Sequence, residues 1–306
     1  MTDQNHRGAA LLDGPVGRRV LFEIARDSAD LPTGAFDAHD DWDTHAHART
    51  SIGELVDAGM QTALRLAETG SDRLLALVGR VILGFAHGSL AQERPLLDHL
   101  HASSDLFMPL AVAIGQAEGT RWWWAPVAPD QLVAEGCSGF GVVDEATVDA
   151  WPARWWSAPT GPGIVHSSRP APDGSPVALW LAEDHWVPVD DPSSCALDVG
   201  GRSPLEITCA EDWQRLVDRF PVRRTRSQGL EWDSFAGSAH AWVDLDWVAV
   251  REVHAGIHLT VAAHLEAAYR PLPVDGGHTM LAGWNPDVTV WLDRDVSALP
   301  AAVYRS

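Results

Sequence analysis

Lysine is absent from the 306-residue chain, in which all 22 basic residues are arginines. Without a lysine amine, no Schiff base can form with a carbonyl substrate, and pyridoxal phosphate cannot be held as an internal aldimine. A Walker A nucleotide-binding loop and a protein-kinase site would also lack an essential lysine. The sequence excludes these chemistries and leaves the identity of any other cofactor unknown.

Cysteine is also scarce. The three cysteines, Cys137, Cys195 and Cys209, lie far apart in the chain. This spacing argues against a disulfide framework and against a zinc site built on paired cysteines. Cys209 is expected in the first turn of a helix, where the helix dipole lowers the pKa of a thiol. A small buried side chain is nevertheless favoured over a nucleophile at this position.

Positive charge is in short supply, because 42 acidic residues face 22 basic ones and give a net charge of −20. A chain this acidic repels the phosphates of nucleic acids and the surface of anionic membranes. The densest basic group consists of Arg223, Arg224 and Arg226, and it is too short for a nucleic-acid footprint. We therefore expect no nucleic acid partner.

Long apolar runs are missing as well. The longest apolar segment, residues 74–85, is interrupted by Gly79 and Arg80, whereas a membrane helix needs about 18 consecutive apolar residues. The N-terminus has no cationic start followed by an apolar run, so no signal peptide is predicted. We expect a cytoplasmic protein that does not enter a membrane.

The first part of the chain is predicted to be mainly helical. One exception is the segment RRVLFEIA at 18–25, whose β-branched and aromatic content favours a strand. Ser51 and Glu54 form a capping-box pattern at the start of a helix that ends before Gly70. The helices are expected at residues 51–68, 72–87, 96–101 and 105–118.

The character of the sequence changes at Thr120. Short aromatic segments punctuated by proline or glycine follow, and they favour strands; they read TRWWWAP, PARWWSAP, VALWLAEDHW and VTVWLD. A strand at 205–207 is expected to enter a second capping box, at residues 208–211, and a helix that runs to Phe220. A short helix at 246–253 and a buried strand at 256–261 are expected after it.

These elements predict an α+β fold rather than alternating βαβ units. An N-terminal helical layer or small bundle, residues 1–119, is expected to pack on a tryptophan-rich and mostly antiparallel β part, residues 120–306, which also holds a few helices. A single domain with a seam near residue 120 is the alternative.

Fifteen tryptophans are many for this length. In a strand, adjacent tryptophans alternate between faces, so a run of them should expose at least one indole. An exposed indole can stack on a ligand or pack against a partner chain. Trp123 and Trp156 are candidates for such a stacking wall. The alternative is that helices and loops cover both faces.

A histidine-rich segment, His39 to His47, holds three histidines and three carboxylates. Histidine and carboxylate side chains bind zinc and iron, but this spacing matches no familiar metal motif. An acidic loop is the favoured interpretation, and no metal is predicted.

The segment 240–266 carries the best candidates for catalysis. A buried imidazole at His258 needs partners for both ring nitrogens, and Asp246 could orient it as a general acid or base. Arg226 could bind an anionic group of a substrate through its planar guanidinium. The alternative is a structural histidine beside arginines that only offset an acidic surface.

Several segments resemble a group of uncharacterised actinobacterial proteins. They are GPVGRRVLFEIA, TRWWWAPV and, near the C-terminus, EDWQRLVDRFP, DWVAV, IHLTVAAHL and MLAGWNPDVTVWL. The resemblance spans most of the chain and implies no activity. A more distant analogy is to ADP-ribosyltransferases, which carry an arginine on an early strand, here Arg18 or Arg19. Their Glu-x-Glu or Gln-x-Glu turn does not occur in this sequence.

Three functional hypotheses follow. The first is an enzyme of specialised or accessory metabolism that acts on a small organic molecule by His/carboxylate acid–base chemistry, at a site between the two parts of the chain. The second is a non-catalytic, immunity-type binding protein whose acidic surface meets a basic partner. The third is an NAD-consuming transferase. A small-molecule ligand is expected, and homo-oligomers are compatible with the sequence.

Overall fold

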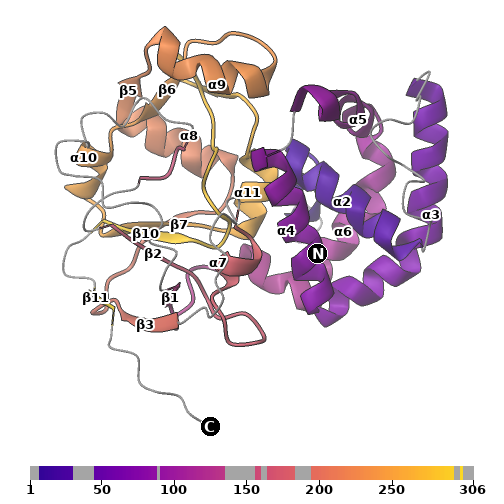
Figure 1. The fold of residues 1–306 in the computed structure, drawn as a ribbon, viewed down its shortest axis with the longest axis horizontal. Coiled ribbons are helices and arrows are strands. Elements are labelled where there is room, and N and C mark those ends of the chain that lie inside the picture. Colours follow the sequence, from indigo (N-terminus) through magenta and orange to yellow (C-terminus); the bar gives the residue numbers. More distant parts are fainter. Residues whose placement is uncertain are drawn as a thin grey trace. The chain divides into compact units, whose positions relative to one another are not determined.

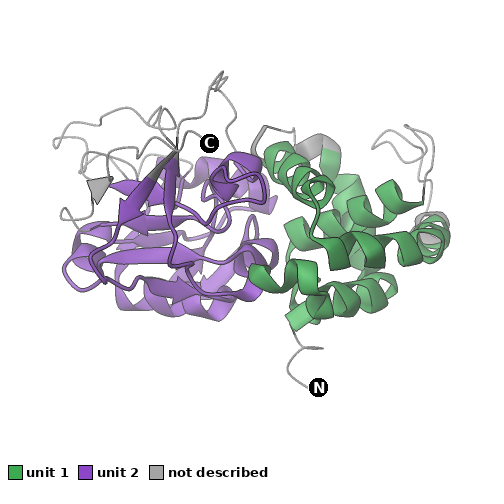
Figure 2. Ribbon diagram, turned by 90° about the horizontal axis from the view of Figure 1, so that it is seen from below, with its two compact units in different colours: residues 1–123 green, residues 124–306 purple. Residues whose placement is uncertain are grey.

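The structure of the chain is a computed structural model that describes residues 7–29, 45–87, 90–134, 156–159, 164–182, 194–292 and 297–298. Its contacts divide the chain into two compact units, Met1–Trp123 and Trp124–Ser306 (Figure 2). The first unit is helical and the second combines sheets with helices. The predicted α+β class is confirmed.

The first unit is a bundle of helices around an aliphatic and aromatic core. Residues of this core include Val16, Phe22, Ile52, Ile82 and Phe107, all of which are buried. The α-helices are α2 (Pro15–Ser28), α3 (His45–Thr69), α4 (Asp72–His87), α5 (Leu90–Ala102) and α6 (Met108–Gln116), and the 3-10 helices are η1 (Ser104–Phe107) and η2 (Glu118–Trp124) (Figure 1).

The strand predicted at 18–25 is wrong, because these residues belong to α2. Gly14 precedes the helix and Pro15 occupies its first turn, where the fixed φ of proline favours helix formation. Ten of the 14 residues of α2 are buried, and α2 contacts α3, α4 and α5. These tertiary contacts override the strand preference of the β-branched and aromatic residues in this segment.

The remaining helices were predicted more closely. Helix α4 has the predicted bounds. Helix α3 ends before Gly70 as predicted, but it begins at His45, so Ser51 lies inside the helix rather than at its N-cap. Gly70 has a φ of +56°, and a Cβ on Gly119 would lie only 2.2 Å from the Gly70 nitrogen. This close approach of two glycine backbones fixes the turn between α3 and α4 against the end of the bundle.

The second unit is built on a four-stranded sheet with the order β2-β10-β7-β4. Its strands are β2 (Val165–Ser167), β10 (Thr289–Trp291), β7 (Gly256–Leu259) and β4 (Leu205–Ile207). The β4–β7 pair is parallel, whereas β10 pairs antiparallel with both β7 and β2. Strand β4 leads into α8 (Ala210–Arg219) and β7 leads into α11 (Val261–Ala267).

A smaller sheet and two strand pairs complete the second unit. In Figure 1, α8 lies on one side of the four-stranded sheet and β1 and β3 lie on the other. The smaller sheet has the order β1 (Leu132–Ala134), β3 (Ser194–Asp198), β11 (Ser297–Ala298), and the strand pairs are β5 (Pro221–Arg223) with β6 (Val243–Leu245) and β8 (Leu272–Val274) with β9 (Gly277–Thr279). The short helices α7 (Val177–Trp180), α9 (Arg226–Ala236) and α10 (Trp247–Arg251) connect these elements.

Only one of the four tryptophan-rich segments is confirmed as a strand, namely β10 in VTVWLD. The TRWWW segment lies in η2, where the Thr120 hydroxyl bonds to the carbonyl of Ile114 at the end of α6. The VALW segment is helix α7. Residues 152–155 of PARWWSAP lie outside the described residues. The predicted buried strand also ends early, because Thr260 is the N-cap of α11.

The tryptophans form core in the second unit. Trp213 and Trp284 pack edge to face with ring centroids 6.0 Å apart, and both are buried. Within the described ranges no tryptophan is exposed: seven are buried and Trp122, Trp124, Trp156 and Trp180 are half-buried. The expectation of an exposed indole is therefore not met in the part of the chain that the structure describes. Among the described helices, none is long and apolar enough to span a bilayer.

Candidate functional site

The four-stranded sheet carries a row of polar side chains on one face. Glu206 on β4 is paired with His258 on β7. His258 is paired in turn with Thr289 on β10, and Thr289 with Ser167 on β2. Paired residues on neighbouring strands point to the same face of a sheet, so these four side chains form one polar row from edge to edge.

The polar row lies at the end of the sheet where the two parallel strands finish. Glu206 and His258 are each the last residue but one of their strands, which then enter α8 and α11. Sites in sheets with parallel strands are usually built beyond the carboxyl ends of those strands. The topology therefore places Glu206 and His258 where such a site is expected.

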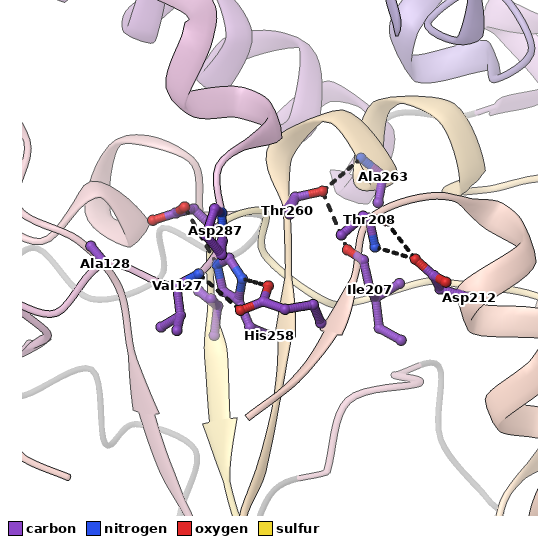
Figure 3. Close-up of polar contacts among 12 residues, drawn as sticks. Val127, Ala128, Ile207, Thr208, Asp212, His258, Thr260, Ala263 and Asp287 are labelled. Carbon is purple, nitrogen blue, oxygen red and sulfur yellow. Dashed lines mark hydrogen bonds and ion pairs between the residues drawn. The ribbon is translucent and has the colours of Figure 1, made fainter. Parts of the chain in front are cut away.

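His258 is held between two carboxylates (Figure 3). Its Nδ1 atom lies 2.6 Å from Oε2 of Glu206 and its Nε2 atom lies 3.5 Å from Oδ1 of Asp287. The first contact is a short, charge-assisted hydrogen bond, whereas the second is an ion pair that is too long for a good hydrogen bond. The His258 side chain is 1% exposed and that of Glu206 is 26% exposed. Glu206 is thus the member of the pair that reaches solvent.

Asp287 is fixed by an arginine from the opposite edge of the sheet. Arg169 follows β2, and its Nε donates to Oδ1 of Asp287 at 2.7 Å while its backbone N–H donates to Oδ2. Asp287 is buried and has a φ of +60°, which is uncommon for a residue other than glycine and is tolerated best by Asn and Asp. Glu206, His258, Asp287 and Arg169 form one chain of charged contacts, called here the charge network.

One peptide group of the chain is bound by both ends of the charge network. The Val127 N–H donates to Oε1 of Glu206 at 2.9 Å, and the Pro126 carbonyl accepts from Nη2 of Arg169 at 3.2 Å. Figure 3 shows Val127 beside His258 and Asp287. All of these residues belong to the second unit.

The charge network changes the protonation of His258. Burial opposes its charge, but the contacts with Asp287 and Glu206 and the charges of both carboxylates outweigh burial and raise the pKa of His258 above its usual 6.5. Two carboxylates, one imidazolium and one guanidinium then balance one another. The arrangement can pass a proton between a buried imidazole and a carboxylate that reaches solvent.

Comparison with protein-family models, with curated proteins and with solved structures finds no match. The geometry of the charge network is therefore the basis on which a function is proposed.

The predicted catalytic pair was His258 and Asp246, but Asp246 does not contact His258 in the structure. Its carboxylate accepts the Ala249 N–H at 3.0 Å and caps α10. The carboxylates that contact His258 are Glu206 and Asp287, so the expectation that Asp246 orients His258 is wrong. Asp246 follows a strand and precedes a helix, and an aspartate there satisfies the free N–H groups of the first helical turn.

Arg226 lies at the start of α9 and is exposed, with no contact to the charge network. Its neighbour Arg224 is the buried arginine of the group. Nε of Arg224 donates to Oδ2 of Asp244 at 2.9 Å, and its guanidinium lies 3.6 Å from the ring centroid of Trp232. The arginine group therefore divides into exposed residues and one structural ion pair.

Trp123 and Trp156 belong to different units of the chain. Trp123 is buried in the first unit, so the structure offers no free ring face for a ligand there. Trp156 is half-buried in the second unit and packs on Gly283, where a Cβ would lie 2.0 Å from its indole. Of these two candidates for a stacking wall, Trp123 is buried and does not fit that role.

The other candidates are resolved in different ways. Burial raises the pKa of the Cys209 thiol to about 11, the opposite of the expected effect of the helix dipole, so Cys209 is unsuited to act as a nucleophile. Arg18 and Arg19 lie on helix α2 rather than on an early strand, which removes the basis of the ADP-ribosyltransferase analogy. No set of metal-ligating side chains is found among the described residues; the side chains of residues 39–48 lie outside them.

Sequence reasoning missed Glu206, Asp287 and Arg169. One signal was present: a glutamate between Leu205 and Ile207 puts a carboxylate on the face of a short strand opposite its apolar neighbours. No comparable signal marked Asp287 or Arg169. Both lie in connecting segments next to strands, and only the order of the strands brings them to His258.

Proposed function

We propose that this protein is an enzyme that acts on a small organic molecule by acid–base catalysis, with Glu206 and His258 as its proton-transferring pair. The observation that carries the proposal is the 2.6 Å contact between the buried Nδ1 of His258 and Oε2 of Glu206. A carboxylate that reaches solvent and is bonded to a buried imidazole can accept a substrate proton while the imidazole holds its orientation.

The surrounding residues have supporting roles. Asp287 and Arg169 are positioning residues, because they orient His258 and balance its charge. In the resting ion pair, Glu206 is the proton acceptor. A proton taken from a substrate leaves a neutral carboxyl at Glu206 beside the His258 imidazolium, which Asp287 still balances. The same proton can return to the product, so no redox partner is required.

The other two hypotheses have less support. An immunity-type binder was expected to use exposed indoles, and the described tryptophans are buried or half-buried. An NAD-consuming transferase would need an arginine on an early strand, a position that Arg18 and Arg19 do not occupy.

Activity profiling against a metabolite extract tests the proposal directly. The purified protein is incubated with the extract, and mass spectrometry compares substrate loss and product gain for wild type and Glu206→Gln. Glu231→Gln, an exposed substitution on α9, is the control. A conversion made by wild type and the control and lost at least a hundredfold in Glu206→Gln supports the proposal. No conversion, or equal conversion by Glu206→Gln, contradicts it.

A further inference from the structure

The polar row contains two buried atoms that make no well-formed hydrogen bond to the described residues: Oγ1 of Thr289, and Nε2 of His258, whose contact with Oδ1 of Asp287 is 3.5 Å long. His258 and Thr289 are directly paired on the two central strands and point to the same face. Both side chains are at most 1% exposed. Buried polar groups almost always have a partner, so two adjacent exceptions require an explanation.

A segment of chain crosses the face of the sheet that carries these two atoms. Pro126 and Val127 bind the charge network through Arg169 and Glu206. Gln131 accepts from the Ser167 hydroxyl at 2.6 Å. Residues 126–131, called here the strap, have no regular secondary structure.

The strap is fastened to both edges of the sheet. Glu206 lies on edge strand β4 and Ser167 on edge strand β2, and the two buried atoms belong to β7 and β10 between them. Four strands span about 14 Å at roughly 4.8 Å per step. The strap bends at Pro129 and Asp130, so part of this width is bridged by the side chains of Glu206 and Gln131, which reach Val127 and Ser167.

From these observations we infer that the strap covers a binding site for a small neutral molecule that presents a carbonyl or hydroxyl oxygen to Nε2 of His258 and Oγ1 of Thr289. The inference rests on the proposed function and names its class of substrate. The charge balance of the network favours an uncharged ligand, since a net ionic group would be buried without compensation.

Release of the strap would open this site and complete the reactive pair in one step. When the strap leaves the sheet, the hydrogen bond from the Val127 N–H to Oε1 of Glu206 is broken. The freed oxygen lies on the same face as His258 and can then act on the bound molecule.

Three small probes of nearly equal size test the inference: acetamide, acetate and acetamidinium, which are neutral, anionic and cationic. The ring ¹⁵N signals of His258 are followed by NMR and assigned with His258→Gln. We expect a saturable shift with acetamide and none with the two ions at the same concentration. The inference would be overturned if acetamide gave no saturable shift, which would mean that the site holds only water. It would also be overturned if all three probes gave equal responses.

Matched variants locate the site. Thr289→Val removes the hydroxyl and keeps the shape, and we expect it to weaken acetamide binding at least tenfold, whereas Thr289→Ser restores binding. Thr279→Val is the control, because Thr279 carries another buried hydroxyl without a partner but lies on β9. Unchanged binding in Thr289→Val would contradict the proposed site.

The covering role of the strap is tested by the rate at which acetamide associates with a variant of the strap. Gln131→Leu removes the contacts of Gln131 with Ser167 and with the Ala128 carbonyl, and we expect acetamide to associate at least threefold faster. An unchanged association rate would contradict the covering role of the strap. Binding is measured without turnover, so acetamide binding in the absence of any metabolite conversion would contradict the enzyme proposal alone. Glu206-dependent conversion without acetamide binding would contradict this site alone.

Discussion

Glu206 and His258 face each other across a pair of parallel strands, with the carboxylate 2.6 Å from the imidazole. Each is the residue before the last of its strand, and each strand then enters a helix. The pairing thus depends on the register of β4 against β7, and a shift by one residue would turn one of the two side chains to the opposite face. The fold itself, rather than a flexible loop, sets the distance between them.

The first prediction concerns the titration of His258. Its pKa is raised in the folded protein by Glu206 on β4 and by Asp287 before β10, with Arg169 after β2 as the nearby positive charge. A raised folded pKa means that the ion pairs contribute their full stability below about pH 6.5 and lose it as the pH rises through the folded pKa.

Urea unfolding between pH 6 and pH 9 measures this contribution. We expect the free energy of unfolding of wild type to fall with rising pH relative to that of His258→Gln. NMR titration should give a pKa above 6.5 for His258 in wild type and a lower value in Glu206→Gln, which removes one carboxylate charge. A pKa of 6.5 or less in wild type would show that burial dominates the two ion pairs.

Much of the helical unit could be predicted because helix ends carry local signals. Gly70 ends α3 and Asp72 begins α4, and both positions follow from residue type alone. Helix α2 could not be predicted in the same way, because it is buried on nearly all sides and its β-branched residues resemble those of a strand. Tertiary contacts decide the structure of such segments.

The candidate site shows the same division. His258 was identified as an imidazole on a predicted buried strand in the segment 240–266, and the structure buries it. Its partners Glu206 and Asp287 are 52 and 29 residues away in the sequence, and the sheet order alone brings them together. Asp246 was closer in sequence and of the right chemical type, but its position before α10 made it a helix cap.

A second histidine should respond to pH in the opposite direction. His264 on α11 is fully buried, and burial lowers its pKa to about 3. The unfolded chain binds a proton that the folded chain excludes, so stability is complete above about pH 6.5 and declines as the pH falls. The expected slope is about 1.4 kcal/mol per pH unit between pH 6 and pH 4.

The substitution His264→Phe should remove this slope and keep the edge contact with Tyr269, whose ring centroid lies 6.3 Å away. Urea unfolding at pH 4, 5 and 6 gives the comparison. His101→Phe, at an exposed position of α5, is the control and should keep the slope of wild type. An identical slope in His264→Phe would mean that His264 is protonated in the folded chain.

Two glycines of the helical unit should change the stability of the protein in opposite directions when replaced by alanine. A Cβ at Gly119 would lie 2.2 Å from the nitrogen of Gly70 and 2.3 Å from the carbonyl oxygen of Ala67, so Gly119→Ala should destabilise the protein by about 1–3 kcal/mol. Gly84 lies inside α4 with open space around its Cβ position. Gly84→Ala should stabilise the helix by about 0.5–1 kcal/mol. Thermal unfolding of both variants checks the signs, and a lower midpoint for Gly84→Ala would contradict the open space.

Cys209 should react slowly with alkylating reagents. With a pKa of about 11, caused mainly by burial, only about one thiol in a thousand is ionised at pH 8, and the thiolate is the reactive form. We expect iodoacetamide to modify Cys209 about a hundredfold more slowly than it modifies free cysteine. Peptide mapping by mass spectrometry measures the rate at this residue, and rapid modification would restore Cys209 as a candidate nucleophile.

Arg224 and Asp244 form a buried ion pair in the second unit, outside the charge network. Substitutions can separate the contribution of its charges from that of the packing of Arg224. The Arg224 side chain is fully buried and stacks on Trp232. Arg224→Met keeps the stacking volume but leaves the Asp244 carboxylate buried without its partner, which should cost about 3–5 kcal/mol in the free energy of unfolding. The double variant Arg224→Met/Asp244→Leu should recover most of this loss, because no uncompensated charge remains.

Arg226→Met, two residues away and exposed, is the control and should stay within about 0.5 kcal/mol of wild type. Urea unfolding of the three variants decides the matter: a double variant as unstable as Arg224→Met would show that the packing of Arg224 on Trp232, and not the charge left at Asp244, is what the fold requires.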